Sequence, residues 1–290
     1  MNAAQLTFGI EFETTMPANY PVGSYSRPIQ AQGLPQGWKC KTDASIRSGA
    51  RGRKGVEFVS PVLQGADGIR QVVAACKALN EMGAKVNASC GCHVHVGGFF
   101  RQFQGAELDK QLKKLVTLVS NFETAIYAST GTKQRERGTW CKGVKRHGNA
   151  DNALTGYTGA TADRYHVLNL TNVRRADKQT AEFRAFAATT NAVKAVGYIR
   201  MCLGLVERAL TAKRTTNWDA KTPTASSPIA RDGEGETALV RLFYQLGWTQ
   251  GRTKKVYGDI THESAPTNKE IKKEFIRLTR KYDSTRSDRS

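Results

Sequence analysis

The chain shows two periods of hydrophobic and polar residues. Over residues 4–15 apolar and polar side chains alternate, which is the period of a β-strand. Runs of similar character predict further strands at 38–46, 55–60, 92–99, 165–171 and 180–187. Apolar residues three or four positions apart predict helices at 65–83, 105–129, 191–213, 236–247 and 267–282.

The order of these elements favours an α+β fold. Three strands come before the first helix, and two neighbouring strands come before the helix at 191–213. Strands that follow each other without an intervening helix are typical of antiparallel pairing rather than of a doubly wound parallel sheet. We therefore expect one mostly antiparallel sheet that is flanked by helices.

Composition predicts one linker and two long loops. Residues 214–235 are polar and hold prolines, serines and glycines, so we expect a linker between a main domain at 1–213 and a small helical extension at 236–290. Residues 16–37 and 131–164 show little periodicity, so both are expected to be loops. The second is expected to be functional, because loops of that length in compact domains commonly are.

The chain carries a large excess of positive charge. Forty-four Lys and Arg residues against 25 Asp and Glu residues give a formal net charge of +19. Such a charge favours acidic partners, namely nucleic acid, nucleotides, another polyanion or a membrane surface, although it can also serve solubility alone. The hydrophobic share of 39% predicts a folded core rather than disorder.

The sequence indicates a cytoplasmic protein without a membrane partner. No apolar run is long enough to span a bilayer, and the segment MNAAQLTFGIEFE lacks the basic and apolar regions of a secretory signal. The six cysteines are scattered through the chain without an export signal, which favours reduced thiols over a disulfide framework.

Acidic residues stand at unusual places in the predicted strands. Glu11 and Glu13 share one face of the first strand, where neighbouring carboxylates repel each other unless water or a cation lies between them. Oxygen ligands of this kind suit Mg²⁺. Glu57 stands alone in an apolar strand. A wet strand face would explain all three carboxylates without a metal ion.

A further strand concentrates cysteine and histidine. Cys90 and Cys92 are expected on one face of this strand, and His93 and His95 on the other. One tetrahedral zinc ion could not collect all four without a kink, so zinc is the less favoured interpretation. The two histidines are expected to act as a pair on the functional face; two hydrogen-bonded core histidines are the alternative.

The last predicted strand places Glu182 and Arg184 on one face. The Glu can hold a metal ion while the Arg binds a phosphate oxygen; a same-face ion pair, which stabilises little, is the alternative. Together, these carboxylates, histidines and arginine are what metal-assisted phosphoryl chemistry requires. The chain has no P-loop, no dinucleotide-binding fingerprint and no convincing Ser-His-Asp context, which disfavours P-loop NTPases, protein kinases and Rossmann enzymes.

An ordered set of segments resembles the amidoligase family. The segments are FGIEFE, WKCKTDASI, GVEFVSPVLQG, NASCGCHVHV, RYHVLNL and TAEFRAFAATTN. That family belongs to the superfamily of glutamine synthetase and glutamate–cysteine ligase, and many members occur in phages. The resemblance covers residues 5–210 and implies a glutamine-synthetase-like half-barrel, a curved and mostly antiparallel sheet, as the catalytic domain.

The resemblance also implies an activity and a set of site residues. The activity is ATP- and Mg²⁺-dependent ligation of a carboxylate to an amine through an acyl phosphate, with Mn²⁺ as a substitute metal. Either substrate could be a small molecule or be linked to a polymer, and a phage enzyme would act in the host cytoplasm. The implied metal ligands are Glu11, Glu13, Glu57, His93 and Glu182. The implied catalytic, nucleotide or substrate contacts are Arg184, His95, Arg164, Arg137 and Asp43.

Two other functions stay open at the level of sequence. The positive charge would suit a nucleic-acid-binding protein on the same fold, although no helix-turn-helix, zinc-finger or RNA-recognition motif appears. A phosphotransferase of the same superfamily would use a similar metal-lined sheet and would form a stable phosphorylated product instead of an amide.

Overall fold

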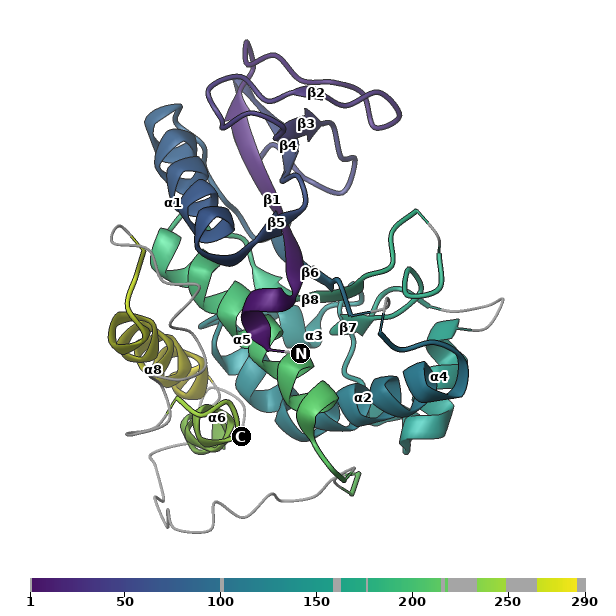
Figure 1. Ribbon diagram of the computed structural model, residues 1–290. Helices are drawn as coiled ribbons and strands as arrows, with labels where there is room; N and C mark the ends of the chain where they lie inside the picture. The colour runs from purple at the N-terminus through teal and green to yellow at the C-terminus, as the bar shows by residue number, and fades with distance from the viewer. Residues whose placement is uncertain are drawn as a thin grey trace.

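A computed structural model describes residues 2–99, 102–158, 163–175, 177–214, 217–218, 234–248 and 265–285. Its strands are β1 (Thr7–Pro17), β2 (Ile29–Gln30), β3 (Lys39–Lys41), β4 (Arg53–Val59), β5 (Leu63–Gln64), β6 (Gly91–Gly97), β7 (Leu168–Asn169) and β8 (Ala181–Ala187). The α-helices are α1 (Gly65–Glu81), α2 (Gly105–Ala128), α3 (Gln134–Arg137), α4 (Ala150–Thr158), α5 (Ala192–Thr211), α6 (Glu234–Gln245) and α8 (Asn268–Ser284). Two 3₁₀ turns, η1 (Ala3–Gln5) and η2 (Lys145–His147), complete the described elements (Figure 1).

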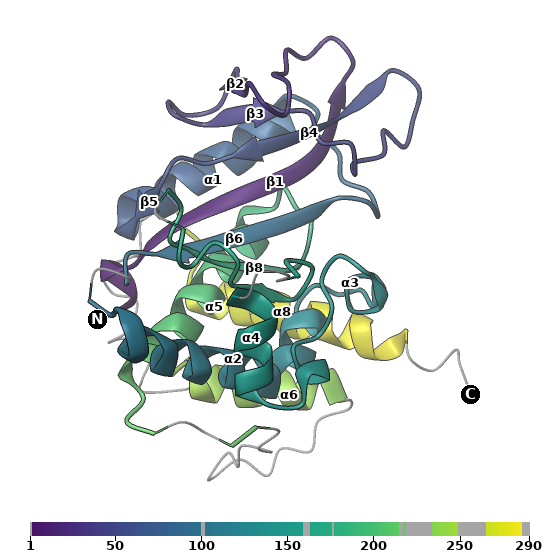
Figure 2. The ribbon, with the colours of Figure 1, turned by 90° about the vertical axis from the view of Figure 1, so that its right-hand side faces the viewer.

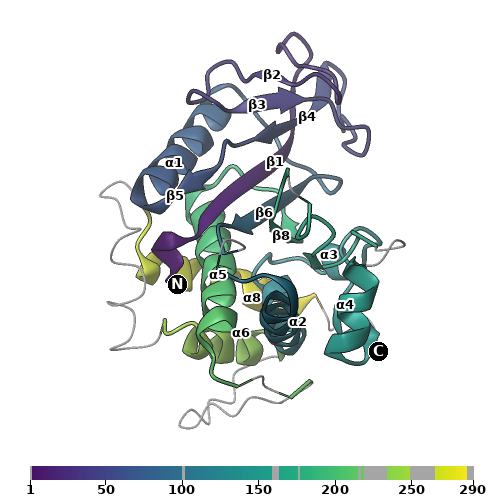
Figure 3. The same ribbon diagram turned by 45° about the vertical axis from the view of Figure 1, so that its right-hand side comes forward.

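The described strands join one open sheet, in the order β2-β3-β4-β1-β6-β8-β7 (Figure 3 from β2 to β8; β7 is labelled in Figure 1). The short strand β5 pairs with the start of β1. Every pairing between these strands is antiparallel. The expected α+β fold with a mostly antiparallel sheet is therefore confirmed.

One face of the sheet is packed against helices. Helices α1 and α5 lie behind the twisted sheet in Figure 2, with the segment that carries α3 and α4 on the other side. The alternation of β1 explains this arrangement, because Phe8, Ile10 and Phe12 are buried in the core and leave the intervening side chains on the opposite face. The ring of Phe12 stacks on Trp38, with the ring centroids 5.9 Å apart.

Local sequence also explains how the helices begin. Asn191 caps α5 by accepting a hydrogen bond from the backbone N–H of Lys194. At α8, Thr267 and Glu270 form a capping box in which each side chain accepts from the other residue's backbone N–H.

The C-terminal helices α6 and α8 pack on α2 and α5. Phe275 of α8 is buried between Tyr198 of α5 and Trp248, with centroid separations of 5.8 and 6.5 Å. The buried Arg200 donates hydrogen bonds to the carbonyl oxygen of Pro266 and to the side chain of Asn268. These contacts join the helices to the same core as the sheet. Most of the expected linker at 214–235 lies outside the described residues.

Four predictions of local structure are wrong in part. The loop expected at 16–37 contains the end of β1 and the short strand β2. The strand expected at 38–46 ends at Lys41, because the Asp43 carboxylate accepts hydrogen bonds from the backbone N–H and hydroxyl of Ser45 and turns the chain. The strand expected at 165–171 shrinks to two residues. The segment at 131–164 is not a plain loop, since it contains α3, η2 and α4.

Candidate functional site

The register of three strands brings the acidic residues together. Glu11 on β1 lies opposite His93 on β6, and His95 on β6 lies opposite Glu182 on β8. On the other side of β1, Glu13 lies opposite Glu57 on β4. All six side chains are on the face turned away from Phe12 and the core, so the predicted sharing of faces is confirmed.

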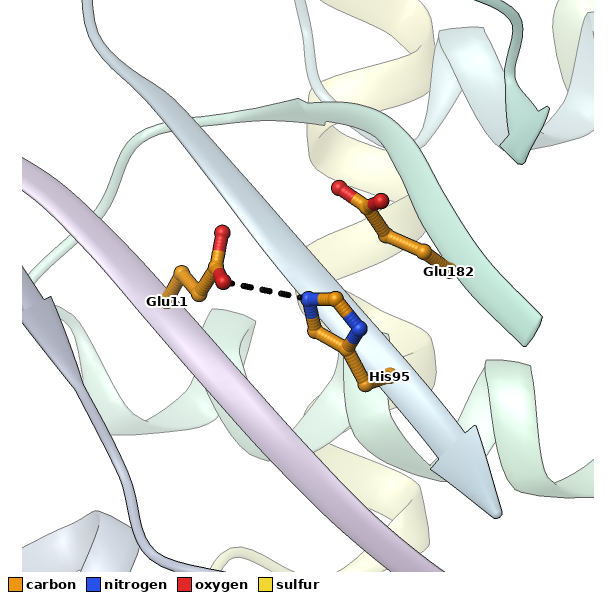
Figure 4. A group of neighbouring side chains, drawn as sticks. All are labelled: Glu11, His95 and Glu182. Atoms are coloured by element: carbon orange, nitrogen blue, oxygen red, sulfur yellow. Dashed lines mark ion pairs between the residues drawn. The ribbon is translucent and has the colours of Figure 1, made fainter. Parts of the chain in front are cut away.

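Glu11, His95 and Glu182 form the tightest group (Figure 4). One potential ligand atom from each residue lies within 4.8 Å of the other two. The Nε2 atom of His95 is 3.2 Å from Oε1 of Glu11, and its Nδ1 atom is 3.3 Å from the hydroxyl of Thr180. The three side chains come from three adjacent strands, so the sheet itself fixes their separation.

His93 connects this group to Glu13. Its Nδ1 atom is 3.0 Å from Oε2 of Glu11, and its Nε2 atom is 3.6 Å from Oε1 of Glu13. The other carboxylate oxygen of Glu13 accepts a hydrogen bond of 2.5 Å from the backbone N–H of Gly91. His93 and Glu13 are both buried, so this part of the site is shielded from water.

The electrostatic setting separates the carboxylates into two kinds. Burial opposes charge on Glu11 and on Glu182, but the nearby His95 keeps the pKa of each carboxyl below its usual value, with Arg184 also acting on Glu182. Burial likewise opposes charge on His95, yet the carboxylates of Glu11 and Glu182 raise its pKa. By contrast, burial and the charge of Glu11 raise the pKa of Glu57 to about 8, against the opposing effect of Lys41.

Two cations pair with the carboxylates. Arg184 donates a hydrogen bond of 2.5 Å to Glu182, as its shared strand face predicts. Lys41 on β3 lies 3.1 Å from Glu57 and 4.7 Å from the ring centre of Tyr25. Lys41 was not predicted from the sequence. Its pairing with Glu57 follows from the β3–β4 register, and no turn motif in the sequence predicts that register.

Two further residues at the site were also missed. Asn169 on β7 donates a hydrogen bond of 2.6 Å to Glu182, and the NLT run around it gave no chemical signal. Arg135 on α3 donates a hydrogen bond of 2.7 Å to the carbonyl oxygen of Arg184. Its position was hidden because the sequence around it shows no strand or long helix.

An aromatic and basic rim lies beside Arg184. The rings of Trp140 and Tyr165 meet edge to face at 4.9 Å, and Trp140 is 52% exposed. The guanidinium groups of Arg164 and Arg184 lie 5.1 and 6.0 Å from the ring centre of Tyr165. Burial works against the charge of Arg164, whereas Tyr165, Tyr25 and Glu182 raise its pKa, which places Arg164 within electrostatic range of the site.

Two residues implied by the resemblance are not part of this cluster. Asp43 is half-buried and serves the turn after β3. Arg137 is exposed on α3 and lines a surface hollow of about 530 Å³ with Thr132, Lys133 and Thr285. No described contact joins either side chain to the carboxylates.

The donor set fits a divalent cation. His95 Nε2 is buried and makes no hydrogen bond in the described structure, although a carboxylate oxygen lies nearby. A cation beside Glu11, His95 and Glu182 would use this nitrogen and relieve the repulsion between the two carboxylates. Two carboxylate oxygens and one imidazole nitrogen suit Mg²⁺ or Mn²⁺ better than they suit a metal ion that prefers thiolate ligands. Cys92 is buried in the core on the other face.

An open antiparallel sheet with carboxylates and histidines on one face is the architecture that the resemblance to carboxylate–amine ligases implies. The model of the family described as "Putative amidoligase enzyme" matches residues 4–150. This match covers just over half of the chain, and the chain belongs to that amidoligase family. No similar sequence is found among curated proteins.

Two of the solved structures that match this chain do so at low sequence identity. A bifunctional glutathione synthetase from Pasteurella multocida matches with 12% sequence identity and a TM-score of 0.47, over 99% of this chain and 52% of its own. PafA, the ligase of the prokaryotic ubiquitin-like protein Pup, matches in its complex with 11% identity and a TM-score of 0.44, over 98% of this chain and 65% of that chain. The present chain therefore spans only about half to two thirds of these proteins.

Proposed function

We propose that this protein is an ATP- and Mg²⁺-dependent ligase that joins a carboxylate to an amine. The observation that carries the proposal is the convergence of Glu11, His95 and Glu182 on one sheet face. Membership in the amidoligase family supports the same reaction class. Within the described residues, no helix combines the length and the apolar character needed to cross a membrane. We further propose a cytoplasmic location.

The proposed roles follow from the contacts. Glu11, His95 and Glu182 hold one metal ion, and Glu13, Glu57 and His93 line the adjoining part of the same face as further metal or substrate ligands. Bound Mg²⁺ would neutralise phosphate oxygens during phosphoryl transfer. Arg184 and Arg164 are the proposed phosphate contacts, because both lie at the edge of the carboxylate cluster beside Tyr165.

The proposed reaction has two steps. A carboxylate oxygen of the first substrate attacks the γ-phosphorus of ATP, ADP leaves, and an acyl phosphate forms. The amine nitrogen of the second substrate then attacks the acyl carbon, phosphate leaves with the bonding electrons, and the nitrogen loses a proton to give the amide. Either substrate can be a small molecule or be linked to a polymer.

The acyl phosphate must be protected from water. Arg135 and Trp140 of the segment at 131–164 lie beside the site, next to Tyr165, and we propose that this segment excludes water during the reaction. We propose residues 1–213 as the catalytic domain and 236–290 as a helical extension. The packing of α8 on α5 gives that extension the role of a support for the catalytic core.

Binding of ATP and Mg²⁺ is the first test. We expect a rise in melting temperature that requires both ligands in the wild type and is lost in Glu182→Gln, because ligands that bind the folded state stabilise it. Glu81→Gln removes an exposed carboxylate from α1 and serves as the matched control. The absence of any shift with ATP and Mg²⁺ in the wild type would refute the proposal.

The chemical class is tested by the product. Incubation with ATP, Mg²⁺ and mixtures of carboxylates and amines should release ADP and phosphate together with an amide, detected by mass spectrometry. A stable phosphorylated product would instead identify a phosphotransferase.

The +19 net charge favours nucleic-acid binding as a second candidate function. That candidate would be supported if the protein binds DNA or RNA with an affinity that falls steeply with salt concentration and is the same in Glu182→Gln as in the wild type.

A further inference from the structure

Arg135 is a cation at the site that no described carboxylate holds in an ion pair. Arg184 pairs with Glu182, and Lys41 pairs with Glu57. Arg135 makes no ion pair with any described residue, although its guanidinium lies on the edge of the same cluster. A guanidinium carries five N–H donors. The guanidinium donates a hydrogen bond to the carbonyl oxygen of Arg184 and lies close to the thiol of Cys141, while its Nε is buried without a partner.

Gly91 makes room for this guanidinium. A Cβ atom at Gly91 would lie 2.9 Å from Nη2 of Arg135, 3.1 Å from Nη1, and 3.1 Å from Nε2 of His93. The backbone N–H of the same glycine donates to Glu13. Arg135, His93 and Glu13 therefore meet around one residue of β6. The backbone of Gly91 has no positive φ, so its missing side chain matters for space rather than for conformation.

We infer that Arg135 forms an anion-binding subsite beside Gly91, which takes a terminal oxyanion, either a phosphoryl group or a carboxylate. A guanidinium fork recognises both anions through parallel hydrogen bonds. A cation that already contacts a protein carboxyl group, as Arg184 and Lys41 do, would have to exchange partners to bind such a ligand, whereas Arg135 does not. The inference rests on the proposed function for the role of the anion, which would be the γ-phosphoryl group of ATP or the carboxylate that is activated.

The test compares binding of defined anions by calorimetry. The probes are ATP and ADP with Mg²⁺, L-glutamate in the presence of ADP and Mg²⁺, and inorganic phosphate alone. Arg135→Gln should weaken binding of at least one probe about tenfold or more, as expected for the loss of charge-assisted hydrogen bonds. A loss for ATP but not for ADP identifies the phosphoryl group, and a loss for glutamate alone identifies the carboxylate.

Matched variants separate binding from a structural role. Arg135→Lys keeps the charge and should retain part of the affinity, whereas a merely structural role predicts equal losses of melting temperature without ligand in both variants. Gly91→Ala should also weaken the affected probe, because its methyl group displaces the guanidinium. Gly9→Ala on β1 is the control, since its Cβ would lie 3.6 Å from the nearest atom, the hydroxyl oxygen of Ser60, in ordinary contact.

Several outcomes would overturn the inference. The inference is wrong if Arg135→Gln binds all four probes as tightly as the wild type does. A loss in Arg137→Gln with none in Arg135→Gln would assign the anion to the surface hollow instead. If the wild type does not bind ATP with Mg²⁺, the proposed function fails. Binding of inorganic phosphate then still tests whether Arg135 forms an anion-binding subsite. The subsite is then overturned if wild-type protein does not bind phosphate or if Arg135→Gln binds it equally well.

Discussion

Replacement of Glu57 by Gln should stabilise the metal-free protein, and the gain should grow with pH. Glu57 is only 4% exposed, lies opposite Glu13 in the β1–β4 register and is close to the charge of Glu11. Burial and that charge raise its pKa from 4.5 to about 8. The charge of Lys41 lowers the pKa of Glu57, but by less than burial and Glu11 raise it. Near neutral pH the wild type therefore keeps a proton on Glu57 when folded and loses it on unfolding.

The sign and size follow from proton linkage. A carboxyl whose pKa is raised by folding contributes its full stabilisation below pH 4.5 and loses it progressively as the pH rises to about 8. At about 1.4 kcal/mol for each pH step, the loss reaches about 3 kcal/mol at neutral pH and about 5 kcal/mol above the folded-state pKa. Glutamine has the same shape and no titrating proton, so the variant does not suffer this loss.

Urea unfolding in the presence of EDTA measures the effect. The difference in unfolding free energy between Glu57→Gln and wild type should increase from about pH 5 to about pH 8 and then level off. Glu81→Gln controls for the change in net charge, because Glu81 is exposed at the end of α1. A difference that does not vary with pH would show that Glu57 titrates as an ordinary carboxyl, and the electrostatic account of this face would be wrong.

Three further predictions concern the metal and the C-terminal helices. Mg²⁺ should narrow the gap between Glu57→Gln and wild type, as seen in the same urea titrations without EDTA, whereas an unchanged gap would place the cation away from Glu57. Phe275→Ala should cost about 3–5 kcal/mol in urea unfolding, because Phe275 is fully buried between α5 and Trp248; an unchanged midpoint would mean that α8 contributes nothing to the core. Thr267→Ala should cost about 1 kcal/mol through loss of the capping box, with Thr267→Ser as the control that keeps the cap.

The fold and much of the site were predictable because both depend on strand periodicity. Alternation along β1 put Glu11 and Glu13 on the face opposite Phe12, and the same rule put His95 opposite Cys92 on β6. The long helices α2 and α5 were predicted close to their observed ends, since their apolar stripes are continuous. These features need only the local chain and the burial of one face.

The residues that were missed depend on contacts between distant segments. Lys41 meets Glu57 only because β3 pairs with β4, and Asn169 meets Glu182 only because β7 pairs with β8. Arg135 reaches the site from a helix of four residues, which is too short to leave a periodic signal. The family resemblance implied Arg137 instead, two positions along the same helix, and the structure leaves that side chain exposed. Register and short helices are set by tertiary packing, so a single sequence does not specify them.

The balance of charge on the sheet face links stability to function. Glu11, Glu13, Glu57 and Glu182 supply four carboxyl groups; Lys41 and Arg184 contact two of them, and Arg135 lies nearby. The remaining repulsion is relieved by protons on Glu57 and on His95, or by an added cation. Each route competes with the other, because a metal ion favours the ionised carboxylates and the neutral imidazoles. The same repulsion that lowers the stability of the metal-free protein should therefore strengthen its affinity for a divalent cation. A variant that stabilises the protein at this face, such as Glu57→Gln, should for that reason bind Mg²⁺ more weakly.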